Sequence, residues 1–426
     1  MQDYNYFCRC FHIIFTMSLE DIIKKLDADT KARMARKVPS WFSVIPGSDR
    51  ESLIFPTALS TQQCSSEATA LYKASVAVGK PLSRRKIADL TGGLGVDSWA
   101  FSKCFDKVLY NEANSGLAAA VKHNFEILGC NNIFVSNKLL KQGSLSEILG
   151  DFEPDIIFLD PARRSQDGKK VFLLEDCQPD VLILKDELLE ACPNLLLKLS
   201  PMADITMLLQ RLGNVRELHV VAFDGECKEL LVLLQRGWNG PASLTLCEEG
   251  QTLHFPEYYD TISNQNPTGY RALRPVDIMG YGHSDPISGK TDIEPAQLLY
   301  EPGKALLKAG LFDYPCTLGY KKLAQHTHLY IAPSTDCHSD SFCHSDRSGG
   351  ISLPGKYFRI EKVLPLQSRT IKELSRQGIA AEVSTHNIPI KAEDLKKRLH
   401  ATPSPTAHIF AASTPAGNLL IITTRI

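Results

Sequence analysis

Three glycines within four residues, between an acidic residue and an apolar segment, could bind a ligand through their backbone. Glycine permits a sharp turn and a close approach of the main chain. A helix expected to begin at Val96 would add unpaired N–H groups. The acid before the glycines would repel a phosphate but could receive an ammonium group. The candidate contacts in this stretch are Asp89, Thr91, Gly92, Gly93, Gly95 and Asp97.

Two further polar groups follow apolar segments that are predicted to be strands. Asn111 and Glu112 follow residues 108–110, and a carboxylate at 112 could accept hydrogen bonds from both hydroxyls of a ribose. The run Asp160 to Arg163 follows four apolar residues. All three groups would lie at the C-terminal ends of strands, the edge at which open α/β sheets bind ligands. Each group is a weak signal alone, but the ordered set predicts a binding site.

The glycine pattern favours S-adenosylmethionine over other nucleoside cofactors. Residues 91–95 do not form the G-x-G-x-x-G pattern of dinucleotide sites, and no Gly-Lys-Ser/Thr of a phosphate loop follows. This disfavours a nicotinamide-dependent oxidoreductase. A ligand that combines adenosine, ribose and an amino-acid tail fits the set, so S-adenosylmethionine is the predicted cofactor.

The elements that would position these groups alternate between strand and helix from about residue 85 to 240. This order predicts a doubly wound, mostly parallel α/β sheet. The predicted strands at 217–223 and 230–234 are separated by a turn too short for a helical crossover. We therefore expect a hairpin with one antiparallel strand.

The chain divides into four predicted regions. Residues 1–80 form a mainly helical segment, 81–240 the cofactor-binding domain, 241–351 a smaller segment with a low-complexity insert at about 334–350, and 352–426 an α+β module. From 351 to 426 there are 11 Lys and Arg against 5 Asp and Glu, a net charge of +6. Such a module could bind phosphates, and a solvated surface explains the charge equally well.

Composition narrows the class of protein. The 426 residues carry a formal net charge of -1, and the 12 cysteines are scattered without a C-x-x-C pair, as is typical of reduced thiols in the cytoplasm. No apolar run is long enough to cross a membrane. Met17 is the predicted translation start, because an amphipathic helix pattern follows it. A Cys-His-Ser-Asp repeat at 337–346 resembles a zinc site only weakly, so no metal is predicted. The oligomeric state stays open.

The motifs together resemble those of class I S-adenosylmethionine-dependent methyltransferases. The most similar group is bacterial and carries a ferredoxin-like segment and a C-terminal THUMP-like domain. The similarity covers about residues 50–426 and is carried by the following segments: 63–67, 87–97, Glu112, 160–163, 198–202 and 299–302. It implies a Rossmann-like sheet of seven strands that ends in an antiparallel hairpin. It also implies, by analogy, a base in rRNA or tRNA as the target.

The resemblance assigns roles to individual residues, and some positions depart from it. Asp160 and the carbonyl of Pro161 would face a target amine or ring nitrogen. Amine-methylating relatives carry an aromatic residue where Arg163 stands, so amine methylation is not favoured. Asn137 stands near a position usually held by an acid that contacts adenine, and an amide could replace it. The segment 385–389 is less basic than expected for RNA contact.

Several alternatives remain at this stage. Arg164 and Lys198 could face the target cleft or lie on the surface. No cysteine is clearly placed as a nucleophile for chemistry at pyrimidine C5. A non-catalytic RNA-binding or assembly protein could keep the same fold. A methyltransferase that acts on a protein or a small molecule also fits, because only the THUMP-like resemblance and the basic module indicate RNA.

Overall fold

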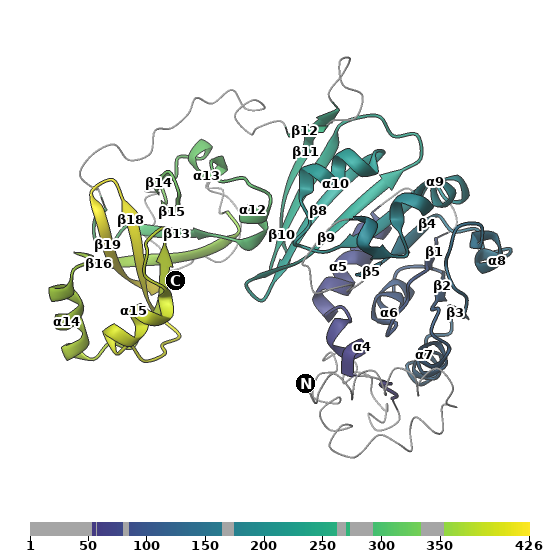
Figure 1. The fold of residues 1–426 in the computed structure, drawn as a ribbon, viewed down its shortest axis with the longest axis horizontal. Coiled ribbons are helices and arrows are strands. Elements are labelled where there is room, and N and C mark those ends of the chain that lie inside the picture. The colour runs from purple at the N-terminus through teal and green to yellow at the C-terminus, as the bar shows by residue number, and fades with distance from the viewer. Residues whose placement is uncertain are drawn as a thin grey trace, which may run out of the picture. The chain divides into compact units, whose positions relative to one another are not determined.

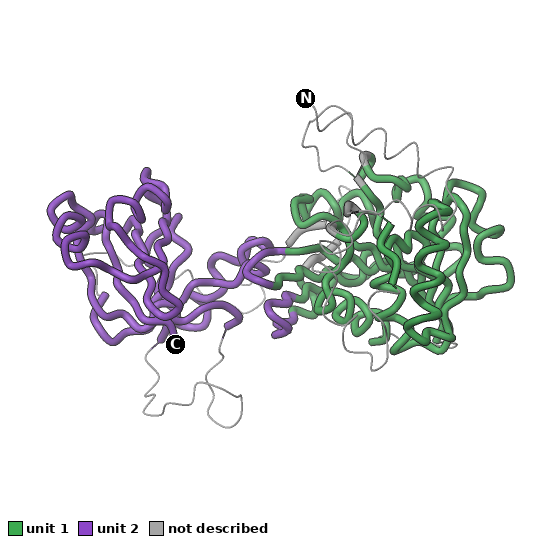
Figure 2. The backbone as a smooth tube through the Cα atoms, turned by 90° about the horizontal axis from the view of Figure 1, so that it is seen from below, with its two compact units in different colours: residues 1–223, 228–245, 255–272 green, residues 224–227, 246–254, 273–426 purple. Residues whose placement is uncertain are grey.

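The computed structural model describes residues 53–56, 58–79, 85–163, 174–261, 270–272, 293–333 and 353–426. The chain forms two compact units (Figure 2). The first comprises residues 1–223, 228–245 and 255–272, and the second 224–227, 246–254 and 273–426. The predictions about Met17, the insert at 334–350 and its Cys-His repeat lie outside the described residues.

A ten-stranded sheet forms most of the first unit (Figure 1), with the order β12-β11-β10-β8-β9-β7-β4-β1-β2-β3. The pairs β1–β2, β2–β3, β1–β4 and β4–β7 are parallel, whereas β9 is antiparallel to β7. The predicted α/β class and its antiparallel hairpin are confirmed. The strands are β1 (Lys86–Asp89), β2 (Lys107–Asn111), β3 (Ile133–Ser136), β4 (Ile156–Leu159), β7 (Asn194–Leu199), β8 (Val215–Phe223), β9 (Glu226–Gln235), β10 (Ala242–Glu248), β11 (Gln251–Thr261) and β12 (Tyr270–Ala272).

Helices cover the central strands on both faces. The sheet order places β2 and β3 on one side of β1, and β4 and β7 on the other. Right-handed crossovers in opposite directions put the connecting helices on opposite faces. The four residues of β4 are all buried, as expected for a strand covered twice. The helices are α4 (Ala58–Gln63), α5 (Glu67–Val78), α6 (Val96–Ser102), α7 (Ser115–Ile127), α8 (Leu145–Leu149), α9 (Val181–Ala191) and α10 (Ile205–Leu212).

Two features of the first unit go beyond the sequence pattern. The sheet continues past residue 240, because β10 joins it beside β8 and all seven residues of β10 are buried. A short ribbon, β5 (Ala162–Arg163) paired with β6 (Cys177–Gln178), follows β4, and the turn η3 (Leu174–Asp176) precedes β6. The ribbon fixes the backbone just after Asp160.

The second unit is built on a seven-stranded sheet with the order β14-β15-β13-β16-β19-β18-β17. Its elements are β13 (Leu298–Pro302), α12 (Lys304–Lys308), α13 (Tyr314–Thr317), β14 (Lys321–Ala324), β15 (Thr327–Ile331), β16 (Gly355–Pro365), α14 (Ser368–Gln377), β17 (Glu382–His386), α15 (Ala392–Leu399), β18 (Ala407–Thr414) and β19 (Gly417–Arg425). Apolar residues of β18 and β19 contribute to a core on each face of this sheet. Because β13 pairs with β16, the segments on either side of residue 350 share one sheet.

Two findings concern the described residues of both units. Within the described residues, no helix is both long and apolar enough to span a bilayer. None of the described cysteines forms a disulfide.

Candidate functional site

The glycine turn after β1 is held in a conformation that larger residues could not adopt. Gly93 and Gly95 have φ angles of +53° and +79°. A Cβ atom on Gly92 would lie 2.1 Å from the ring of Tyr110. The Tyr110 hydroxyl donates to the carbonyl of Gly93 at 2.6 Å, and the Gly92 N–H donates to the carbonyl of Asn111 at 2.8 Å. Because the turn is built from glycines, its main chain above the ends of β1 and β2 is not covered by side chains of its own, as the sequence predicts.

Asp89 lies beneath this turn and is only 1% exposed. One carboxyl oxygen accepts from Ser98 Oγ at 2.7 Å and the other from the Thr91 N–H at 3.2 Å. Burial raises the pKa of Asp89 to about 8, although both hydrogen bonds lower it. The carboxyl group thus anchors the turn to α6, and both of its oxygens have partners within the protein.

Glu112 links the glycine turn to the start of α7. Its two carboxylate oxygens accept from the Gly93 N–H at 3.0 Å and the Asn114 N–H at 2.8 Å. The residue is only partly buried at the end of β2, so a ligand lying on the turn could reach it. This is the position from which the predicted contact with ribose hydroxyls would be made.

The two asparagines near Glu112 position the backbone around it. Buried Asn111 donates to the carbonyls of Leu90 and Lys138, and its side-chain oxygen accepts from the Lys138 N–H. Exposed Asn137 donates to the carbonyls of Glu112 at 2.6 Å and of Ala113. The structure thus brings both predicted residues close to Glu112 at the end of β2, where their amide nitrogens support the loop after β2.

Asp160 follows β4 and lies next to the glycine turn. Its N–H donates to Thr91 Oγ1 at 2.6 Å, which connects the β4 end to the β1 end. Its Oδ2 accepts from Lys198 Nζ at 2.5 Å, and the two side chains are 33% and 17% exposed. The sequence left open whether Lys198 faces this site or lies on the surface. In the structure it faces the site. Buried Pro161 follows directly.

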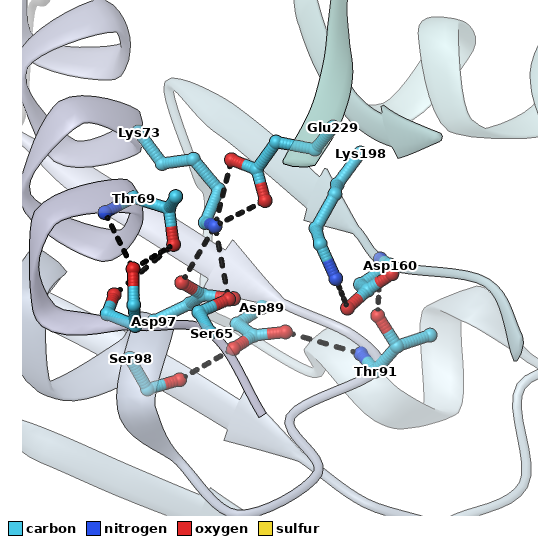
Figure 3. A network of polar contacts seen from close by, with 11 residues as sticks. Ser65, Thr69, Lys73, Asp89, Thr91, Asp97, Ser98, Asp160, Lys198 and Glu229 are labelled. Carbon is cyan, nitrogen blue, oxygen red and sulfur yellow. Dashed lines mark hydrogen bonds and ion pairs between the residues drawn. The ribbon is translucent and has the colours of Figure 1, made fainter. Parts of the chain in front are cut away.

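A buried network of charges lies beside this edge (Figure 3). Lys73 on α5 is 0% exposed and donates to both carboxylate oxygens of Glu229 on β9, each at 3.0 Å. Lys73 Nζ also donates to Ser65 Oγ at 2.9 Å and lies 3.2 Å from Asp97 Oδ1. Ser65 in turn donates to Asp97 Oδ2 at 2.9 Å. Asp97, predicted as a cofactor contact, thus joins α6 to α5.

The charges of this network act on one another. Burial raises the pKa of Glu229, although the ammonium groups of Lys73 and Lys198 oppose the shift. Burial also lowers the pKa of Lys198, but the carboxylates of Asp160, Glu229 and Asp97 outweigh it and raise the pKa above the usual range. Lys198 is accordingly a fixed positive charge at neutral pH.

Cys64 lies near the same groups but is not an activated thiol. Its Sγ donates to the Thr61 carbonyl, and burial, followed by the nearby Asp97 carboxylate, raises the pKa of the thiol to about 11. Nucleophilic and metal-binding cysteines act as thiolates. In the part of the chain that is described, no group of histidines, cysteines and acids could hold a metal ion.

The sequence analysis missed some residues of the site, and two residues that it named are not described or only partly described. The side chain of Arg163 and all of Arg164 are outside the described residues. The sequence analysis used 63–67 only as part of the family resemblance and gave no role to Ser65, Lys73 and Glu229. In the structure, Ser66 is the N-cap of α5. The signal for the others was a charged residue on an otherwise apolar helix face and another in an apolar strand.

Comparison with known proteins places this fold among methyltransferases. A THUMP domain-like family model matches residues 355–425, and a ferredoxin-like domain model matches 298–336. No curated protein sequence matches the chain. The crystal structure of a candidate methyltransferase from Porphyromonas gingivalis W83 is 26% identical, with a TM-score of 0.68, over 96% of this chain and 94% of that one. The chain has the methyltransferase fold with ferredoxin-like and THUMP-like domains.

Two other solved structures are similar over part of the chain. Human methyltransferase 10 domain containing protein is 12% identical with a TM-score of 0.36, over 50% of this chain and 98% of that one. TrmK from M. capricolum, in complex with S-adenosyl-homocysteine, is 11% identical with a TM-score of 0.29, over 39% and 68%. These scores are too low to support statements about function.

Proposed function

We propose that the chain is an S-adenosylmethionine-dependent methyltransferase that modifies rRNA or tRNA in the cytoplasm. One observation supports the assignment as an S-adenosylmethionine-dependent methyltransferase: the glycine turn, Glu112 and Asp160 meet at one edge of the sheet. Bare backbone and a partly exposed carboxylate fit an adenosine with its ribose, and Asp160 stands beside them. When bound, the cofactor would supply an electrophilic methyl group; the protein would orient the acceptor in line with it.

The second part, the RNA substrate, is supported by the THUMP domain-like match and by surface charge. The described residues 353–426 include the exposed basic residues Arg369, Lys372 and Arg376 on α14. Their spacing of three and four residues places them on one face of the helix. Such a face suits the phosphates of RNA.

Binding and turnover of two variants test the cofactor site. Glu112→Ala should weaken S-adenosylmethionine binding about tenfold or more, because a charged hydrogen-bond acceptor is worth roughly 1.5–3 kcal/mol. Asp160→Ala should abolish methyl transfer while cofactor binding stays close to that of the wild type. Isothermal titration calorimetry measures the first effect, and transfer of labelled methyl groups measures the second. Unchanged turnover of Asp160→Ala would exclude its proposed role.

Three rivals can be separated from this proposal by direct measurement. A non-catalytic RNA-binding protein would bind no S-adenosylmethionine in the calorimeter. An oxidoreductase would bind NAD instead. A protein or small-molecule methyltransferase would bind S-adenosylmethionine but leave nucleosides unchanged. Mass spectrometry of nucleosides in RNA from cells with and without the gene decides this last case.

A further inference from the structure

Two lysines and two carboxylates from four separate elements meet beside the proposed cofactor edge (Figure 3). Lys73 comes from α5, Asp160 from the end of β4, Lys198 from β7 and Glu229 from β9. From this juxtaposition we propose that the methyl acceptor is a hydroxyl oxygen, namely the 2′-hydroxyl of a ribose in RNA. The inference rests on the proposed methyltransferase function and names the atom that it modifies.

The ammonium group of Lys198 is the first argument for a hydroxyl. A base amine has two N–H groups that need acceptors, whereas Asp160 Oδ2 already accepts from Lys198 at 2.5 Å and leaves Oδ1 for one proton, the number that a hydroxyl carries. Within the described part of the chain, Asp160 is the only hydrogen-bond partner seen for Lys198 Nζ. An ammonium carries three donors. The remaining ones suit an acceptor oxygen rather than an amine.

The strength of the nucleophile is the second argument. An alcohol is a poor nucleophile until its proton is removed or a nearby cation stabilises its negative charge. Lys198 remains cationic because the carboxylates of Asp160, Glu229 and Asp97 raise its pKa. A fixed charge that is mostly buried, with 17% of its side chain exposed, stabilises developing negative charge far better than one in water.

Lys73 and Glu229 act as positioning residues in this arrangement. Lys73 binds both oxygens of Glu229, and the pair is almost fully buried, at 0% and 3% exposure of the side chains. Because both oxygens are held, the Glu229 carboxylate is fixed in place. Its charge is one of the carboxylate charges that raise the pKa of Lys198. The buried pair therefore supports the charge that acts on the acceptor.

The transfer step balances with these groups. The hydroxyl oxygen forms a bond to the methyl carbon while the carbon–sulfur bond breaks, and the electron pair of that bond stays on sulfur. The hydroxyl proton passes to a carboxylate oxygen of Asp160. Lys198 stabilises the oxygen while the proton leaves. No oxidant or other reactant is needed.

Two features speak against chemistry on a base. Residues 160–163 contain no aromatic side chain that could stack on an extruded base. Methylation of pyrimidine C5 by covalent catalysis needs a thiolate, and the pKa of nearby Cys64 is raised to about 11. The 2′-hydroxyl is the hydroxyl that RNA offers within a chain and that distinguishes it from DNA.

The position of the label in methylated RNA tests the inference. Total RNA from cells that lack the gene is incubated with the full-length protein and S-adenosylmethionine labelled in its methyl group. The RNA is then digested to nucleosides and fragmented in a mass spectrometer. We expect the label on the ribose fragment, and we expect the labelled dinucleotide to resist alkaline cleavage. Label on the base fragment overturns the inference and leaves the proposed function intact.

Variants of Lys198 provide a second, independent readout. Lys198→Met should lower the rate of transfer about 100-fold, in line with removal of one stabilising donor. Its affinity for S-adenosylmethionine by calorimetry should stay that of the wild type, and Lys198→Arg should recover part of the rate. Lys122→Met, at an exposed lysine of α7, is the matched control and should transfer at the wild-type rate.

The outcomes separate the inference from the function on which it rests. A Lys198→Met protein that transfers methyl groups at the wild-type rate overturns the role of Lys198. Failure of the wild-type protein to bind S-adenosylmethionine overturns the proposed function itself. Binding of S-adenosylmethionine without label in any RNA overturns both the RNA substrate and the ribose acceptor.

Discussion

A charge network of the first unit is buried, whereas a basic cluster of the second unit is exposed. In the first unit, Lys73 and Glu229 are 0% and 2% exposed and hydrogen-bond to each other. Asp97, Asp160 and Lys198 extend this set to the proposed cofactor edge. In the second unit, Arg369, Lys372 and Arg376 on α14 are exposed and, with Ser368 and Glu373, line a shallow surface depression.

The contrast separates the proposed reaction site from the proposed RNA-contact surface. A buried charge is stable only when it is paired and hydrogen-bonded, so its geometry is fixed by several elements at once. An exposed charge is solvated and adds to the surface potential without a fixed geometry. We therefore expect changes in the first set to affect folding and turnover, and changes in the second to affect RNA affinity alone.

The largest effect is expected for Lys73→Met. Removal of this ammonium leaves the buried carboxylates of Glu229 and Asp97 without their cation, which costs about 3–5 kcal/mol of unfolding free energy. No tryptophan lies beyond Trp238, so urea unfolding followed by tryptophan fluorescence reports on the first unit.

Matched variants sharpen this prediction. Lys122→Met in the same unit should change the unfolding free energy by no more than about 0.5 kcal/mol. The double variant Lys73→Met with Glu229→Leu should recover part of the loss, because neither charge is then left alone. Equal effects of Lys73→Met and Lys122→Met would remove the distinction between buried and exposed charges.

A pH-dependent effect is expected at Asp89, and over any single pH unit it is smaller than the effect of Lys73→Met. Its pKa is raised from an ordinary 3.8 to about 8 by burial, so the folded state binds more protons than the unfolded state between these values. Stability from this group is complete below about pH 4 and is lost as pH rises toward 8, with a slope of at most about 1.4 kcal/mol per pH unit.

Asp89→Asn isolates this contribution, because asparagine does not titrate. Relative to this variant, the wild-type protein should lose stability from pH 4 to pH 8 and then stay constant. Urea midpoints at intervals of one pH unit measure the difference. A difference that does not vary with pH would show that Asp89 is ionised throughout this range in the folded protein.

The elements of the site follow from local patterns, whereas its charge network does not. The apolar run of β4 and the glycines after β1 predict a strand and a turn, because each feature is contained in a few neighbouring residues. The Lys73–Glu229 pair joins residues 156 positions apart, and nothing local connects them. Only the unusual place of each charge within an apolar element indicates that a partner exists.

The same reasoning explains where the sheets differ from expectation. The hairpin β8–β9 was predictable because neighbouring residues determine its turn. Asp224 and Gly225 in this turn have φ angles of +55° and +70°. The addition of β10 beside β8 depends on pairing between strands that are not consecutive. The union of β13 with β16 is another such pairing, across the segment 334–352 that separates the described parts.

The smallest effect on stability, and a selective effect on binding, is expected for the basic face of α14. The triple variant Arg369→Gln, Lys372→Gln and Arg376→Gln removes three exposed charges but no buried contact, so each change should cost no more than about 0.5 kcal/mol. RNA affinity should fall, and the slope of log affinity against log salt should decrease in magnitude by about 2, since each phosphate contact to a single strand contributes about 0.7.

The matched control replaces three exposed lysines of the first unit, Lys103, Lys107 and Lys122, by glutamine. An equal loss of affinity in that control would assign binding to overall charge and not to α14, whereas a loss confined to the α14 variant would assign RNA binding to the basic face of α14.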